Sequence, residues 1–253
     1  MKTLGFSISI SIFALLPLFA AGDAPKPPQQ QWSFSGMRGT FDRGELQRGF
    51  QVYREVCASC HGINLLSFRN LSALGFSDAE IKAIAAEYEV ADGPDDAGEM
   101  YDRPAEPHDR FVPPFANEKA ARASNNGSLP PDLSLITKAR FNGPDYLYAL
   151  LTGYQDQPEG TEVQEGMYYN IYFPGNQIAM KSPLSDGQVE YSDGTTATVA
   201  QMSRDVTAFL AWAAEPEMES RKETGLMVLL YMLIFTAFLF ISMNRIWARV
   251  KEG

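Results

Sequence analysis

The spacing of apolar positions predicts a mainly helical chain. Residues 45–56 carry Leu46 and Phe50 on one face, with apolar side chains three or four positions apart. Residues 199–213 repeat this spacing from Met202 onwards. We therefore expect two amphipathic helices, and we expect the second to pack on the first.

Shorter patterns predict further elements between these two helices. Residues 77–80, Ser-Asp-Ala-Glu, have the sequence of a helix start, and the apolar spacing continues to Ala85. Residues 145–152 read as a helix that ends at Gly153. Residues 186–196 alternate and contain an Asp-Gly pair, which predicts a small β-hairpin.

The first of two long apolar runs lies at the amino terminus. Lys2 precedes an apolar run over residues 8–19, and the small residues 20–22 follow it. A basic start, a short apolar core and a small-residue exit are typical of a secretory signal peptide. We therefore expect residues 1–22 to be a signal peptide and the chain after it to be exported.

The second apolar run, residues 225–243, contains no charged side chain. At about 1.5 Å per residue it reaches roughly 28 Å, enough to cross the hydrocarbon core of a bilayer. This pattern predicts an exported domain over 23–224, a transmembrane helix over 225–243 and a cytoplasmic tail over 244–253.

Charge excludes one class of partner. The formal net charge is -10, whereas binding to nucleic acid requires a basic surface. Residues 85–106 hold eight acidic side chains and one basic one, Arg103. We interpret this segment as a solvated loop; the alternative is a docking surface for a basic electron-transfer partner.

The candidate chemistry lies directly after the first predicted helix, in Cys57-Ala-Ser-Cys60-His61. Two cysteines separated by two residues and followed by histidine are the pattern that attaches a c-type haem, with the histidine as axial iron ligand. A zinc knuckle would need four ligands, and only one further histidine, His108, is present. A redox dithiol and a short-loop disulfide also compete with haem attachment as interpretations of this pattern.

The second axial ligand is less constrained by the pattern. Outside the signal and the span, six methionines are available: Met37, Met100, Met167, Met180, Met202 and Met218. Met180 is favoured modestly, because it lies in an apolar, proline-flanked loop from which a side chain can reach the face opposite His61. His108 is the alternative, and it would give a lower potential. Arg140 is a candidate partner for a haem propionate, or an ordinary surface arginine.

Longer stretches resemble the cytochrome c1 family, in a bacterial form. The resemblance rests on residues 49–61 around the Cys-x-x-Cys-His pattern, on 123–134 (ASNNGSLPPDLS), on 145–154 and on 172–180 (YFPGNQIAM). It implies a cytochrome c-type fold with long loop insertions and one carboxy-terminal transmembrane helix.

The resemblance also implies a function and a set of site residues. It implies one covalent haem c, attached to Cys57 and Cys60, with His61 and Met180 as iron ligands. It implies further haem contacts from Asn125, Pro130, Pro131, Arg140 and Tyr146. The expected role is electron transfer in a dimeric ubiquinol:cytochrome c oxidoreductase (bc1) complex of the bacterial inner membrane, with the haem domain in the periplasm. Its partners would be cytochrome b, a Rieske iron–sulfur protein as donor and a c-type cytochrome as acceptor.

Two further functions remain open from the residues themselves. One is a membrane-anchored single-haem shuttle that works outside any bc1 complex. The second is a haem-free adhesion or assembly protein whose two cysteines form a redox pair. No cysteine remains to brace the Met180 loop by a disulfide, so packing or hydrogen bonds must hold it.

Overall fold

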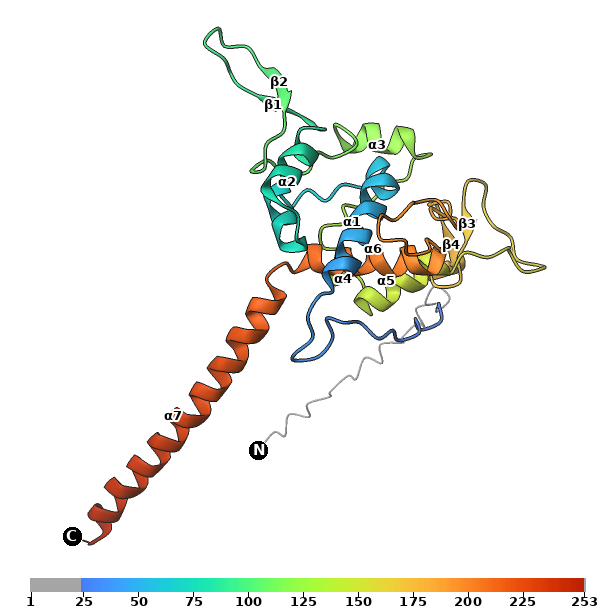
Figure 1. The fold of residues 1–253 in the computed structure, drawn as a ribbon. Coiled ribbons are helices and arrows are strands. Elements are labelled where there is room, and N and C mark those ends of the chain that lie inside the picture. Colours follow the sequence, from blue (N-terminus) through green and yellow to red (C-terminus); the bar gives the residue numbers. More distant parts are fainter. Residues whose placement is uncertain (1–23, 253) are drawn as a thin grey trace, which may run out of the picture.

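A computed structural model of the protein describes residues 24–252 (Figure 1), and the expected signal peptide lies outside this range. The α-helices are α1 (Arg43–Glu55), α2 (Asp78–Ala85), α3 (Glu118–Ser124), α4 (Ile136–Ala139), α5 (Gly143–Thr152), α6 (Val199–Ala214) and α7 (Met218–Glu252). The 3-10 helices are η1 (Cys57–Ser59), η2 (Phe68–Leu74) and η3 (Pro174–Asn176). The strands are β1 (Glu89–Asp92), β2 (Tyr101–Pro104), β3 (Tyr168–Tyr169) and β4 (Gln177–Ile178). The expectation of a mainly helical fold is confirmed.

The core forms where α1 crosses α6, as their apolar faces predict. Phe50 of α1 and Phe209 of α6 are buried, with ring centroids 5.6 Å apart. Gly49 allows the close approach, because a Cβ at this position would lie 2.0 Å from the main-chain oxygen of Asp205. The two helices therefore meet at close range here, and α1 holds a fixed position from which the Cys57–His61 segment leaves.

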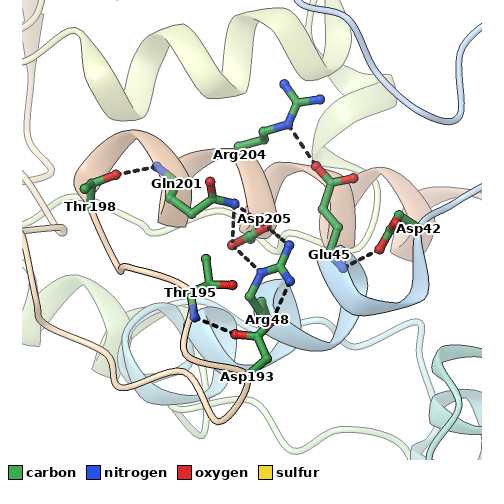
Figure 2. Close-up of polar contacts among 9 residues, drawn as sticks. All are labelled: Asp42, Glu45, Arg48, Asp193, Thr195, Thr198, Gln201, Arg204 and Asp205. Carbon is green, nitrogen blue, oxygen red and sulfur yellow. Dashed lines mark hydrogen bonds and ion pairs between the residues drawn. The ribbon is translucent and has the colours of Figure 1, made fainter.

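A charged network crosses the same helix pair (Figure 2). The Arg48 guanidinium binds the carboxylate of Asp205 at 3.1 Å and that of Asp193 at 2.8 Å. Asp205 is fully buried, so this pairing compensates its charge. Arg204 binds Glu45 at 3.1 Å, and burial raises the pKa of Glu45. The network adds directional contacts to the apolar packing of α1 on α6.

The prediction of a β-hairpin over residues 186–196 is wrong, because the structure has no strand in this segment. Its alternation is real, since Val189 and Tyr191 are buried while their neighbours are exposed. The buried side faces the core rather than a partner strand. Hydrogen bonds to Thr195 and the Arg48 ion pair hold the pKa of Asp193 at about 2.

The acidic segment contains an unexpected hairpin, formed by β1 and β2 and projecting from the body of the domain (Figure 1). Val90 pairs with Arg103 in an antiparallel register. Arg103 binds Asp92, and it binds Asp109 at 2.7 Å. The single basic residue of the segment thus compensates two of the acids around it.

An amino-terminal arm, residues 24–41, runs along α5 and α6 to the root of α7 (Figure 1). The Trp32 indole donates to Asp145 of α5 at 2.7 Å, and the Arg204 guanidinium lies 5.0 Å from the centroid of the indole ring. The ammonium group of Lys222 in α7 donates to the carbonyls of Phe34 and Gly39 at 2.6 and 3.0 Å. The arm thereby ties the haem-motif domain to the final helix.

Helix α7 extends away from the domain (Figure 1) and is 35 residues long. It is long and apolar enough to cross a membrane, and its most apolar stretch is not buried against the domain. This is the arrangement expected of a transmembrane helix over 225–243. The helix also continues beyond both ends of that run, without a break at the domain boundary.

Candidate haem site

The Cys57–His61 segment forms a tight turn directly after α1. The main-chain N–H groups of Cys60 and His61 both donate to the carbonyl of Cys57, at 3.1 and 2.9 Å. Helix α1 ends at Glu55, and the 3-10 helix η1 follows it over Cys57–Ser59. The turn brings both thiols and the imidazole to one end of α1.

His61 is held in the form that suits a metal ligand. Its Nδ1 lies 2.8 Å from the carbonyl oxygen of Pro131, an acceptor, so Nδ1 carries the proton. The lone pair is then on Nε2, for which no hydrogen bond is found within residues 24–252. Burial lowers the pKa of His61, which favours the neutral ring. The Tyr53 hydroxyl donates to the main-chain oxygen of His61 at 3.0 Å and fixes the backbone.

The segment that supplies the Pro131 carbonyl is itself fastened to the histidine turn. The Leu133 N–H donates to the Gly62 carbonyl at 2.8 Å, and the Asn64 N–H donates to the Asp132 carboxylate at 2.9 Å. The buried Ser134 hydroxyl accepts from the Leu65 N–H at 3.1 Å. Three residues therefore position the His61 turn although sequence patterns did not single them out: Tyr53, Asp132 and Ser134. The last two lie in the Pro-Pro-Asp-Leu-Ser stretch, from which they could have been predicted.

No disulfide joins Cys57 and Cys60, so both sulfurs are available for another bond. Burial raises the pKa of the Cys57 thiol to about 12, and Cys60 acts in the same direction. Reactive dithiols typically have a lowered thiol pKa, and burial acts on Cys57 in the opposite direction. Within residues 24–252 no three His, Cys, Asp or Glu side chains come together in an arrangement that could hold a metal ion.

The methionines differ sharply in their surroundings. Met37 and Met100 are 72% and 64% exposed, while Met202 and Met218 are buried in the core. His108 is exposed on the surface. Met180 is half-buried and packs against the same apolar core as Cys57. Met167 is also half-buried, so these two methionines are the ones whose environment suits an axial ligand.

The Met180 loop is fastened by hydrogen bonds to the end of α5. The Tyr154 hydroxyl donates to the main-chain oxygen of Met180 at 3.0 Å. The Ile171 N–H donates to the Gly153 carbonyl at 3.1 Å, and the buried Asn170 amide donates to the Leu150 carbonyl at 2.8 Å. These contacts provide the bracing expected in place of a disulfide.

The remaining residues that the resemblance implies have mixed surroundings. Asn125 is half-buried and donates from its amide to the carbonyl of Ala121 at 2.7 Å, closing α3. Pro130 is half-buried and Pro131 is exposed. Arg140 is exposed, and no ion pair to it is found among residues 24–252.

Arg140 and Tyr146 are close enough to interact. Burial raises the pKa of Tyr146, and the Arg140 charge acts in the opposite direction. Tyr146 in turn acts on Tyr154, whose pKa is raised mainly by burial. The exposed Arg140 guanidinium thus lies near Tyr146, which interacts with the Tyr154 that binds the Met180 carbonyl. This position suits pairing with a carboxylate of a ligand.

The residues present fit a covalent haem. Two free thiols and a histidine with an available Nε2 lie in one turn, and half-buried apolar side chains pack beside them. The fold and site define the class: a c-type haem domain on an apolar helix.

The comparisons with known proteins give the family. The model of the "Cytochrome C1 family" matches residues 32–250, and the chain belongs to this family. It is 50% identical to "Cytochrome c1" of Rhodospirillum rubrum, over 88% of each chain. It is 48% identical to "Cytochrome b/c1" of Bradyrhizobium diazoefficiens, over 96% of this chain and 40% of that protein. It is 56% identical to "Cytochrome c1 1, heme protein, mitochondrial" of Arabidopsis thaliana, over 78% of this chain and 64% of that protein.

The bacterial cytochrome c1 resemblance is thereby confirmed. The chain spans less than two thirds of the length of the last two relatives, and nearly the whole of the first.

Proposed function

We propose that this chain is the haem c subunit of a ubiquinol:cytochrome c oxidoreductase (bc1) complex in a bacterial inner membrane. It would take electrons from a Rieske iron–sulfur protein and pass them to a c-type cytochrome. Family membership supports the redox role, and the name "Cytochrome b/c1" of one relative supports an association with cytochrome b. We further propose that the complex is dimeric.

The observation that carries this proposal is the hydrogen bond from His61 Nδ1 to the carbonyl of Pro131, at 2.8 Å. Within residues 24–252 it leaves Nε2 without a hydrogen bond, in the same turn as Cys57 and Cys60. Haem bound there would supply reversible one-electron chemistry between ferric and ferrous iron. The chain needs no acid, base or nucleophile for this role.

The protein residues orient the group and set its environment. Cys57 and Cys60 would attach it through thioether bonds, and His61 and Met180 would be the iron ligands. A thioether ligand favours the reduced state and raises the potential. Asn125, Pro130, Pro131 and Tyr146 would line the haem, and Arg140 would pair with a propionate.

We also propose the topology. Helix α7 would span the inner membrane, with the domain before it in the periplasm and residues 244–253 in the cytoplasm. The uncharged run 225–243 supports the span. The expected signal peptide, which would export the chain before the run, supports the orientation. Residues 1–22 would be removed on export.

The test is purification of the full chain in detergent, followed by a reduced-minus-oxidised spectrum. We expect a c-type haem in this chain, and cytochrome b and an iron–sulfur protein in the same fraction. A haem-containing chain purified without cytochrome b would instead support the free membrane-anchored shuttle. Replacing Met180 with Leu should lower the midpoint potential strongly, and an unchanged potential would reject Met180 as ligand.

A further inference from the structure

A pocket of about 380 Å³ lies between the arm and the first turns of α7. Its walls include Met37 and Arg38 from the arm, and Lys222, Glu223 and Leu226 from the helix. The walls are held in place by hydrogen bonds, because Lys222 donates to two carbonyls of the arm. The pocket is thus a fixed feature of the contact between the arm and α7.

Its depth places it at a membrane surface. Leu226 belongs to the uncharged run that begins at Gly225. Lys222 and Glu223 precede Gly225 by three and two residues, which is about 3–5 Å along the helix axis. The headgroup layer on each side of a bilayer is about 5–8 Å thick. If α7 spans the membrane as proposed, the pocket opens within that layer.

The charges of the lining residues are of both signs. No ion pair or hydrogen bond to the Arg38 side chain is found within residues 24–252, and Lys222 has one ammonium N–H beyond the two that it donates. The Glu223 carboxylate likewise has no partner in the described part of the chain. Glu219, also in the lining, is compensated by Arg43 at 2.6 Å.

Two cations and one uncompensated carboxylate match a zwitterion better than a simple anion. We propose that the pocket binds the phosphoethanolamine headgroup of a membrane lipid in the periplasmic leaflet. Arg38 and Lys222 would bind the phosphate, and Glu223 would bind the ammonium group. Met37, which is 72% exposed, and Leu226 would contact the apolar part of the lipid. This inference rests on the proposed membrane span.

The experiment uses the intact complex in detergent with a photoactivatable phosphatidylethanolamine, and it maps the cross-linked peptides. We expect a cross-link to residues 34–41 or 218–230. Arg38→Gln should lower the yield about tenfold at subsaturating lipid, because it removes a charge-assisted contact from the phosphate. Arg110→Gln is the matched control, since this exposed arginine lies outside the pocket, and it should leave the yield unchanged.

A second comparison tests the zwitterion. Phosphatidylglycerol lacks the ammonium group, so it should compete weakly with the probe in the parent protein and more strongly in the Glu223→Gln variant. Excess free phosphoethanolamine should compete poorly, because it has no acyl chains.

Three results would overturn the assignment. These are an equal yield with Arg38→Gln, competition by free phosphoethanolamine as strong as by the lipid, and equal competition by phosphatidylglycerol in the parent and in Glu223→Gln. Alkaline carbonate extraction tests the span separately: a chain that stays in the membrane but gives no cross-link refutes the pocket alone.

Discussion

The hydroxyl of Tyr154 should hold the proposed iron ligand in place. It donates to the main-chain oxygen of Met180 at 3.0 Å, and Tyr154→Phe removes this donor while keeping the ring. A neutral hydrogen bond contributes about 1 kcal/mol, and leaving a half-buried carbonyl unpaired costs at most about 3 kcal/mol. The population with Met180 displaced should therefore rise between about fivefold and 150-fold.

Carbon monoxide reports that population, because it binds ferrous haem only where the sixth position is open. Stopped-flow mixing of the reduced protein with carbon monoxide should give an association rate that is faster in Tyr154→Phe by the same factor. Tyr172→Phe is the control, since no hydrogen bond to the Tyr172 hydroxyl is found within residues 24–252. Equal rates for the two variants and the parent would refute the role of Tyr154.

Three further changes test the scaffold. Gly49→Ala should destabilise the fold by about 2–3 kcal/mol in thermal unfolding, because its Cβ would collide with the Asp205 carbonyl. Gly44→Ala, on the same helix, is the control and should be tolerated. Equal stabilities of the two variants would contradict the close crossing of α1 and α6. Asp145→Ala should cost about 1.5–3 kcal/mol, because two hydrogen bonds from the arm end on this carboxylate, and limited proteolysis should then cleave the arm faster. The pKa of Asp193 is lowered to about 2, so its stabilising contribution is complete above its ordinary pKa of 3.8 and is lost as pH falls towards 2. Melting temperatures measured from pH 5 to pH 2 should therefore fall less in Asp193→Asn than in the parent.

Local periodicity predicted the helices that bury a continuous stripe of apolar side chains. The expected helices over 45–56, 145–152 and 199–213 correspond to α1, α5 and α6, with boundaries that differ by up to two residues. The packing of α6 on α1 was also predicted, because each helix has one apolar face. These elements depend on short-range spacing, which the sequence displays directly.

Elements that depend on distant partners were not predicted. In the β1–β2 hairpin Arg103 pairs with acids at positions 92 and 109, whereas a count of charges alone indicates a solvated loop. Conversely, residues 186–196 alternate because the core buries one side of the segment, not because they form a ladder. Alternation reports one-sided burial, and it becomes a strand only when a second strand is available.

The candidate site likewise combines residues that a local pattern predicts with contacts between residues far apart in the sequence. Cys57, Cys60 and His61 lie within five consecutive residues, so the pattern alone predicted them as a site. The contact of His61 with Pro131 joins residues 70 positions apart, and periodicity contains no signal for it. The relation of Tyr154 to Met180 is likewise a product of tertiary structure.

The most direct test of the central claim is the intact mass of the purified chain after extraction with acid acetone. Covalent attachment at Cys57 and Cys60 predicts a coloured polypeptide whose mass exceeds that of the processed chain by one haem. It also predicts that the double Cys57→Ser, Cys60→Ser variant loses both the colour and the added mass. A colourless parent chain with the mass of the polypeptide alone would contradict the account.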